Sequence, residues 1–190
     1  MEEKRTIETE RLILREPRES DWQDIHKGGN HIEISKNLFN LAHPWPEQEA
    51  KDMVNLSIKQ IKEIGDRQYF FQLKKTGEVM GNIRVGVLDG VGDLCGHVRF
   101  EYQGEGYMEE ALKPVIEMLF KCNVVKEFTA YLFEDNEKAR YLFEKFGFEQ
   151  KLTEDYVVSK SNGKNHRLVK YYLTKPKWRK EIFKKDRTLL

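Results

Sequence analysis

The spacing of apolar residues changes several times along the chain, and each change marks a new element of secondary structure. Apolar residues recur every three to four positions over 50–64 and 107–121, which predicts two long helices. Shorter helices are expected at 20–29 and 136–146. Short apolar runs bounded by turn residues are typical of strands, and they occur at 10–16, 69–73, 79–88, 94–100, 128–133, 148–159 and 166–173. This order predicts one α/β (α+β) domain with a mixed, mostly antiparallel central sheet of about seven strands flanked by helices.

Pro114 lies inside the second of the two long helical patterns. A proline has no N–H group with which to bond the carbonyl of the residue four positions earlier, here Glu110. We therefore expect the helix over 107–121 to bend between Glu110 and Pro114.

Composition excludes several classes of protein. The 190 residues include 33 Lys and Arg against 32 Asp and Glu, and a net charge of +1 argues against a dedicated nucleic-acid binder. No apolar stretch reaches the roughly 18 residues of a membrane span, and no apolar run follows the N-terminus, so neither a membrane partner nor a signal peptide is expected. Cys95 and Cys122 lack CxxC spacing, which favours free thiols in a cytoplasmic protein. The histidines show no metal-ligand spacing, so no metal is expected.

Charge is distributed unevenly between the body of the chain and its end. Residues 175–190 carry seven basic and two acidic side chains, which leaves residues 1–174 mildly acidic. We expect a folded domain over 1–174 and a basic helical tail over 175–190. Both a solvated terminal helix and an RNA contact fit such a tail.

One segment between a predicted strand and a predicted helix suits the binding of an anion. Two glycines allow positive φ, so consecutive N–H groups can face outward, and the helix N-terminus adds its positive dipole end. No Gly-Lys-Ser/Thr follows, which excludes a nucleoside-triphosphate loop, and Glu109 stands where a dinucleotide fingerprint has its third glycine. The segment comprises Gln103, Gly104, Glu105, Gly106, Tyr107 and Met108.

At these residues the sequence resembles the GNAT family of N-acetyltransferases, in particular the branch of ribosomal-protein N-terminal acetyltransferases. The acetyl-CoA loop of that family reads Arg/Gln-x-x-Gly-x-Gly/Ala, which the segment from Gln103 fits, and Gly-Tyr-Met-x-Glu-Ala-Leu at 106–112 is familiar in the branch. Further matching motifs are Glu-Arg-Leu-Ile-Leu-Arg at 10–15, Pro-Trp-Pro at 44–46, the helix pattern at 136–148 and the Asn-Gly-Lys-x-His hairpin at 162–166. The resemblance thus covers about residues 8–174 and implies a GNAT-like fold, with two strands splayed apart at the cofactor site.

The resemblance implies acetyl-CoA as cosubstrate and assigns residues to it. Backbone groups of Val98 should bind the pantetheine arm, the N–H groups from Gln103 to Met108 the pyrophosphate, and Asn136 the pantetheine or phosphate region. Asn136 also suits a helix N-cap. Arg99 fits either a solvated strand position or a contact to a phosphate or a substrate carboxylate. Phe143 stands where many members have a tyrosine that acts as general acid, and Phe100 stands where a proline is usual.

Catalysis by direct attack requires a neutral amine close to the thioester. The base candidates are Asp93, where this branch often has a glutamate, and then Glu101 and Asp135, acting directly or through water. A protein N-terminal α-amine, with a pKa of about 7.7–8.0, needs less base catalysis than a lysine side chain at about 10.4. The substrate contacts proposed are His43, Trp45 and His166.

The sequence therefore predicts an acetyl-CoA-dependent N-acetyltransferase, with a protein N-terminal α-amine as the favoured acceptor. A small amine such as a polyamine, an amino acid or an aminoglycoside is the alternative acceptor. A non-catalytic acyl-CoA-binding module is the alternative that Phe143 suggests. The sequence is compatible with a monomer or a homodimer.

Overall fold

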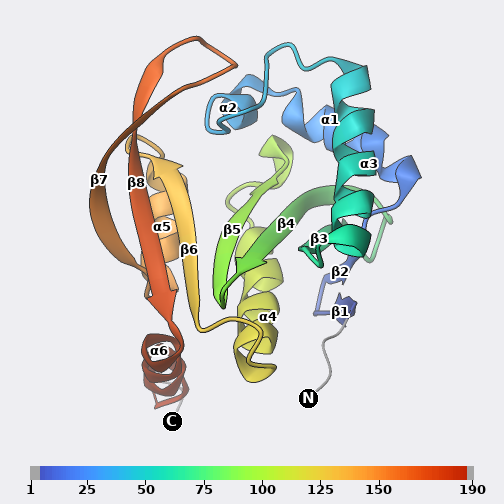
Figure 1. Cartoon of the computed structure of the whole chain (residues 1–190). Helices are drawn as coiled ribbons and strands as arrows, with labels where there is room; N and C mark the ends of the chain where they lie inside the picture. Colours follow the sequence, from blue (N-terminus) through green and yellow to red (C-terminus); the bar gives the residue numbers. More distant parts are fainter. Residues whose placement is uncertain (1–4, 188–190) are drawn as a thin grey trace.

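The computed structural model describes residues 5–187, with side chains described as far as Glu181, and it shows one open sheet with helices on both faces (Figure 1). The strands are β1 (Thr6–Glu8), β2 (Leu12–Arg15), β3 (Arg67–Leu73), β4 (Val79–Leu88), β5 (Val91–Val98), β6 (Glu127–Phe133), β7 (Glu149–Val158) and β8 (Asn165–Thr174). The helices are η1 (Glu19–Asp21), α1 (Trp22–Gly29), α2 (Ile32–Ser35), α3 (Glu47–Glu63), η2 (Phe100–Tyr102), α4 (Tyr107–Lys121), α5 (Glu137–Lys145) and α6 (Lys175–Arg187).

The sheet has eight strands in the order β1-β2-β3-β4-β5-β6-β8-β7, and β5 and β6 form its parallel pair among antiparallel neighbours. The mixed, mostly antiparallel sheet is thus confirmed, with one strand more than predicted. The additional strand, β1, is three residues long and pairs with β2, and so short a strand shows no period of its own in the sequence.

The parallel pair is short, and this opens the sheet. Strands β5 and β6 are paired only from Val91 to Asp93, opposite Glu127 to Thr129. Beyond that point β5 follows β4 as far as Val98, whereas β6 follows β8 as far as Phe133. The two strands therefore diverge into a V, visible between β5 and β6 in Figure 1, which confirms the predicted splay.

Hairpin chemistry explains where β5 begins. Asp89 and Gly90, which join β4 to β5, have φ values of +52° and +79°, and two positive φ values in a two-residue loop are the requirement of a type I′ turn. Strand β5 starts directly afterwards at Val91, three residues earlier than the apolar pattern predicted. It ends at Val98 rather than Phe100, because the chain turns there into the short helix η2.

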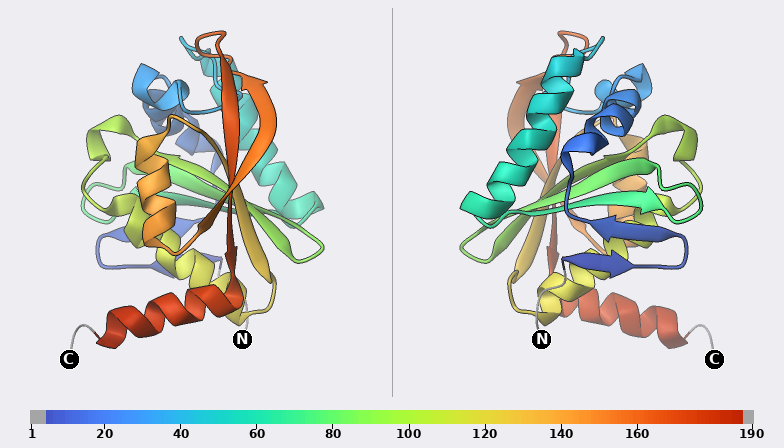
Figure 2. Two further views of the ribbon diagram at one scale, coloured as in Figure 1. Left: turned by 90° about the vertical axis from the view of Figure 1, so that its left-hand side faces the viewer. Right: turned by 90° about the vertical axis from the view of Figure 1, so that its right-hand side faces the viewer.

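Two hydrophobic clusters lie on opposite faces of the sheet, because successive strand residues point to opposite sides. The larger contains Tyr69 and Phe71 together with side chains of α4 and α5. The smaller contains Phe70, between those two residues, with side chains of α1 and α3. Figure 2 shows α3 on the opposite side of the sheet from α4 and α5.

The end of helix α1 is shaped by close packing as well as by glycine. A Cβ atom at Gly28 would lie 2.4 Å from Cγ of Arg99, and one at Gly29 would lie 2.5 Å from Cζ3 of Trp45. The helix ends at Gly29, as predicted. The glycines are required there because two large side chains occupy the space in which a Cβ atom would stand.

Residues 175–187 of the basic tail form helix α6, which continues directly from β8. Trp178 of this helix is 6% exposed, and its ring stacks on Phe146 at 5.8 Å between centroids. Helix α6 is thereby attached to the main core. None of the helices described between residues 5 and 187 combines the length and hydropathy of a membrane-spanning segment.

Helix α4 is continuous from Tyr107 to Lys121 and contains Pro114. The expected bend between Glu110 and Pro114 stays a prediction.

Candidate active site

The loop before α4 has the backbone conformation that an anion site requires. Gly104 and Gly106 have φ values of +84° and +77°, which confirms the positive φ expected of both glycines. Gly106 is the N-cap of α4, and no side chain caps this end of the helix. The first amide to bond back is that of Glu110, which donates to the carbonyl of Gly106 at 2.9 Å. The N–H groups of the first turn therefore have no intrahelical acceptor and suit an anion.

An arginine from the N-terminal hairpin supports this loop. Arg11 Nη1 donates to the carbonyl of Glu105 at 3.0 Å, and its guanidinium carbon lies 4.0 Å from the centroid of the Tyr107 ring. Arg11 Nε donates to Glu110 Oε2 at 2.6 Å, and Thr9 Oγ1 donates to Glu110 Oε1 at 2.5 Å. Burial alone would raise the pKa of Glu110, but these hydrogen bonds outweigh it and lower the pKa. Arg11 belongs to the Glu-Arg-Leu-Ile-Leu-Arg motif at 10–15, but no contact with the loop was predicted for it.

The remaining loop residues connect the loop to its surroundings. Gln103 accepts a hydrogen bond at 2.7 Å from Lys138 of α5, and Met108 packs against the main core. Gln103 has φ −72° and ψ 147° and precedes Gly104 at positive φ, the values of a type II turn. The loop is therefore held between the N-terminal hairpin on one side and α5 on the other.

The open edge of β5 faces the V between β5 and β6. The amide of Arg99 donates to the carbonyl of Met80 on β4 at 2.8 Å. Neighbouring strand residues direct their N–H and C=O groups to opposite edges, so those of Val98 and Gly96 point away from β4. Because β6 does not pair with β5 here, these groups are placed to bind an extended amide-containing chain, such as a pantetheine arm.

Asn136 is the N-cap of α5, at the end of the loop that follows β6. Its Oδ1 accepts from the amide of Ala139 at 3.2 Å, which confirms the capping role. A contact between Asn136 and the cofactor stays a prediction.

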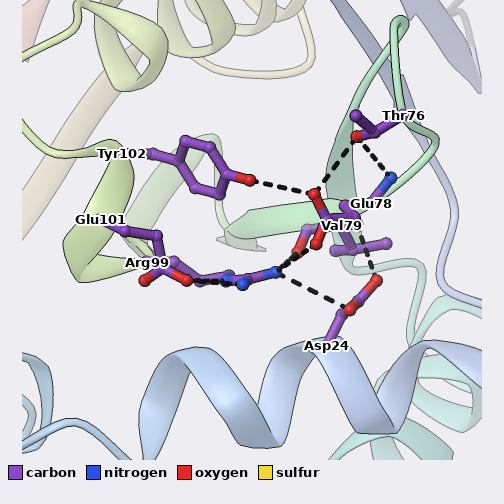
Figure 3. A network of polar contacts seen from close by, with 7 residues as sticks. All are labelled: Asp24, Thr76, Glu78, Val79, Arg99, Glu101 and Tyr102. Carbon is purple, nitrogen blue, oxygen red and sulfur yellow. Dashed lines mark hydrogen bonds and ion pairs between the residues drawn. The ribbon is translucent and has the colours of Figure 1, made fainter.

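Arg99 is a buried ion-pair centre (Figure 3). Its side chain is 2% exposed, and Nη2 lies 2.5 Å from Glu101 Oε1. Nη1 lies 3.7 Å from carboxylate oxygens of both Asp24 on α1 and Glu78 before β4. Tyr102 donates its hydroxyl to Glu78 at 3.0 Å. The expectation of a solvated Arg99 is therefore wrong, because this guanidinium joins α1, the β3–β4 turn and η2. A phosphate or substrate contact for Arg99 stays a prediction.

The three base candidates occupy different environments. Burial raises the pKa of Asp93 despite the nearby charges of Arg84 and Lys170, so Asp93 is a stronger base than an ordinary carboxylate. Burial would also raise the pKa of Glu101, but its backbone hydrogen bond and the contact with Arg99 lower it, which makes Glu101 the weaker base.

Asp135, the third base candidate, is close to a residue proposed as a substrate contact. Its Oδ1 lies 3.6 Å from Nδ1 of His166, and the imidazole stacks on Phe133 at 4.3 Å between centroids. Asp135 was predicted as a base and His166 as a substrate contact, without any expected contact between them. They come from the end of β6 and the start of β8, and β-sheet pairing brings them together.

The other two proposed substrate contacts differ in exposure. His43 is exposed, in the turn that contains the cis peptide bond to Pro44. Trp45 is 4% exposed and packs in the smaller hydrophobic cluster, with its amide bonded to Asn30 Oδ1 at 2.7 Å. Trp45 is thus a core residue that packs with side chains of α1 and α3.

Phe143 lies in the main core with 7% exposure, and its ring contacts Phe148 and Tyr171 at 4.7 and 5.8 Å between centroids. The hydroxyl of Tyr171 is directed to Glu144 and Gln150, at 3.4 and 3.2 Å. Phe143 has no hydroxyl, and the hydroxyl of Tyr171 is already bonded. Neither residue therefore replaces the tyrosine that the family resemblance places at Phe143.

Comparison with known proteins identifies the family. The family model of the acetyltransferase (GNAT) domain matches residues 11–149, and the chain belongs to this family. It is an acetyl-CoA-dependent GNAT acetyltransferase. The uncapped helix end and the unpaired edge of β5 are the features of this chain that fit coenzyme A: the loop amides suit its diphosphate, and the strand edge suits its amide-containing arm.

Solved structures show the same fold at low identity. RimL, a ribosomal L7/L12 α-N-protein acetyltransferase in complex with coenzyme A, has a TM-score of 0.75 at 16% identity over 89% of this chain and 97% of its own. A ribosomal-protein-S5-alanine acetyltransferase from Vibrio fischeri has 0.68 at 17% over 91% and 98%. MccE, a microcin C7 self-immunity acetyltransferase in complex with acetyl-CoA and AMP, has 0.70 at 16% over 87% and 93%. The search of curated proteins returned no match.

Proposed function

We propose that this enzyme transfers an acetyl group from acetyl-CoA to a protein N-terminal α-amine, by direct attack of the amine in a ternary complex. The observation that carries the proposal is the character of the available base. Burial raises the pKa of Asp93, which makes it a stronger base than an ordinary carboxylate, but it remains a carboxylate. Such a base suits an amine whose pKa lies close to physiological pH, because a substantial fraction of that amine is already neutral.

The energy of amine deprotonation favours an α-amine over lysine. An α-amine has a pKa of about 7.7–8.0, within about one unit of neutral pH, whereas a lysine side chain at about 10.4 must lose some three units, or about 4 kcal/mol. A site whose base is one carboxylate with a raised pKa meets the first demand more easily than the second. In this proposal Asp93 accepts the proton of the attacking amine, directly or through water.

Direct attack is favoured over a covalent acetyl-enzyme because neither Cys95 nor Cys122 lies in a recognisable nucleophile motif. Burial raises the pKa of Cys95, the largest of several effects on this thiol. A thiol with a raised pKa carries less of the reactive thiolate. Two free thiols are also consistent with the cytoplasmic location that we propose.

The similar structures are described in terms that leave more than one kind of acceptor open. RimL is described as an α-N-protein acetyltransferase of ribosomal L7/L12, which supports a protein terminus. MccE is described as a self-immunity acetyltransferase toward microcin C7, so a small-molecule amine remains the alternative acceptor for the test below.

The test combines binding and turnover. Calorimetry measures acetyl-CoA binding, and a thiol-release assay then follows turnover with peptides bearing a free α-amine, the same peptides with a blocked α-amine and a free lysine, and spermidine. Release with the free α-amine peptides alone supports the proposal. Preference for spermidine would move the assignment to a small amine, and acetyl-CoA binding without release on any acceptor would contradict catalysis itself.

A further inference from the structure

Two polar side chains on β4 and β5 face each other without a hydrogen-bond partner. Asn82 and His97 are direct cross-strand neighbours, and cross-strand neighbours project from the same face of a sheet. Asn82 Oδ1 and His97 Nε2 are buried, and neither finds a partner among the residues that the structure describes. Buried polar atoms are nearly always bonded, and an unbonded one costs about 1–3 kcal/mol. A partner from outside the chain would remove this cost.

The pair lies next to the strand edge that is proposed to bind the pantetheine arm. His97 stands between Gly96 and Val98, the two residues whose backbone groups face the V between β5 and β6. The side chain of His97 projects from the same face as that of Asp93, because both are odd-numbered positions of one strand. The face that carries the candidate base therefore also carries the unpartnered pair.

The two strands are held too closely for this region to rearrange easily. A Cβ atom at Gly96 would lie 2.3 Å from the carbonyl oxygen of Asn82, and one at Gly81 would lie 2.1 Å from that of His97. Both strands therefore need glycine next to the pair. The backbone beside the pair is therefore fixed, and a ligand would reach the two buried atoms by rotation of the Asn82 and His97 side chains.

The chemistry of the pair favours a neutral hydrogen-bond donor. Burial lowers the pKa of His97 to about 4, so its imidazole is neutral at physiological pH and has one nitrogen that accepts a hydrogen bond. The Asn82 amide oxygen is a second acceptor. In the tautomer that carries its proton on Nδ1, His97 Nε2 is the accepting nitrogen. The two adjacent acceptors then match the two N–H bonds of a neutral primary amine and disfavour an anion.

We propose that Asn82 Oδ1 and His97 Nε2 bind the N–H groups of the acceptor amine and orient its lone pair for attack on the thioester. This inference rests on the proposed acetyltransferase function. The pair acts as positioning residues that select the neutral amine. Asp93 lies four residues before His97 on the extended strand β5, about 13 Å away, so in this arrangement it would receive the proton through water and not by direct contact. Because the pair would contact only the amine, its loss should affect the acceptor and not the binding of acetyl-CoA.

The variants Asn82→Leu and His97→Phe remove one acceptor each while keeping a similar side-chain shape. Trp178→Phe is the matched control, since Trp178 Nε1 is likewise buried without a partner among the described residues but lies on α6. For each variant we would measure the Kd of acetyl-CoA by calorimetry, the KM and kcat for the best free α-amine peptide of the panel, and the free energy of unfolding in urea.

Each site variant is expected to raise the KM of that peptide about tenfold or more, corresponding to one lost hydrogen bond. The Kd of acetyl-CoA should stay within twofold, and stability should be unchanged or higher because an unpartnered polar atom has been removed. Trp178→Phe should leave KM unchanged. A peptide KM within twofold of wild type in both site variants would overturn the inference, because the pair would then not contact the amine.

A measurement without turnover separates this inference from the proposed function. In enzyme saturated with coenzyme A, addition of the peptide should shift the ¹⁵N resonances of the His97 imidazole, identified by their loss in His97→Phe. If acetyl-CoA binds and peptide is acetylated but these resonances do not move, the pair does not bind the amine. If wild-type enzyme neither binds acetyl-CoA nor acetylates any acceptor, the proposed function fails and the inference fails with it.

Discussion

Replacement of Arg99 by methionine tests whether the ion-pair network holds the walls of the site together. Methionine has similar length and no charge, so the variant keeps much of the packing against Gly28 and loses every polar contact of the guanidinium. It leaves the carboxylates of Glu101, Glu78 and Asp24 without their shared cation, and the carbonyl of Val79 without its donor at 3.4 Å. Removal of one partner from a buried ion pair costs about 3–5 kcal/mol.

The three carboxylates reduce this figure because they are partly hydrated. The side chains of Asp24, Glu78 and Glu101 are 34%, 38% and 46% exposed, whereas that of Arg99 is 2% exposed. Water therefore compensates part of the lost interaction. We therefore expect Arg99→Met to lower the free energy of unfolding by about 2–3 kcal/mol. For a chain of this size, that corresponds to a fall in Tm of about 4–12 °C.

Urea unfolding followed by circular dichroism measures this change, with the transition slope as a check that the native state is still compact. Arg5→Met is the matched control. Arg5 pairs with Glu16 at 3.4 Å, but its side chain is 82% exposed, and the change should stay within about 0.5 kcal/mol. If Arg99→Met were as stable as this control, the network would not contribute to folding and the reasoning would be refuted.

Four further predictions concern the cofactor loop, a helix cap and pH. Gly106→Ala and Gly77→Ala both place alanine at φ +77°, and each should cost about 1–2 kcal/mol of stability. Only Gly106→Ala should also weaken acetyl-CoA binding, which calorimetry measures. Equal affinities of the two variants for acetyl-CoA would contradict the loop assignment. Arg11→Lys should raise the KM of acetyl-CoA about fivefold with little change in kcat, since lysine cannot replace the planar donor contacts of arginine. An unchanged KM would show that the loop keeps its conformation without Arg11. Asn136→Ala should lower stability by about 1 kcal/mol in urea, the usual value of an N-cap; no loss would mean that the cap contributes nothing. Burial lowers the pKa of His97 in the folded state to about 4, below its unfolded value of 6.5, because it disfavours the protonated imidazole. Protonation therefore favours the unfolded state, and stability that is fully present above pH 6.5 falls by at most about 3 kcal/mol as the pH falls toward 4. His97→Phe should lose less stability than wild type between pH 7 and 4, and identical pH profiles would contradict the shift.

The elements with a strong local signal were predicted closely from the sequence. Strand β4 and helix α4 have the predicted bounds, 79–88 and 107–121, because a sustained apolar period over ten or more residues is a local property of the chain. The positive φ of Gly104 and Gly106 and the cap at Asn136 were also predictable, since each depends on a residue's own backbone freedom or on neighbours within one helical turn.

The family resemblance added the splayed strands, which no local pattern contains. The structure shows its physical origin, since β5 and β6 share only three paired positions before each follows a different antiparallel partner. A sequence period indicates a strand but does not say where its pairing with another strand ends. Strand β1 and helix α2 were missed for a different reason, because three or four residues are too few to establish a period.

The sequence by itself thus determined the order of the elements, the glycine loop and the kind of chemistry this protein performs. Only the tertiary structure decided which side chains surround that loop. It placed Arg11 against Glu110, ninety-nine positions away, buried Arg99 among three carboxylates from separate elements, and set Asn82 opposite His97 without partners. The physical reason is that periodicity and backbone preference act over a few residues, whereas ion pairing, burial and strand register join residues far apart in the chain.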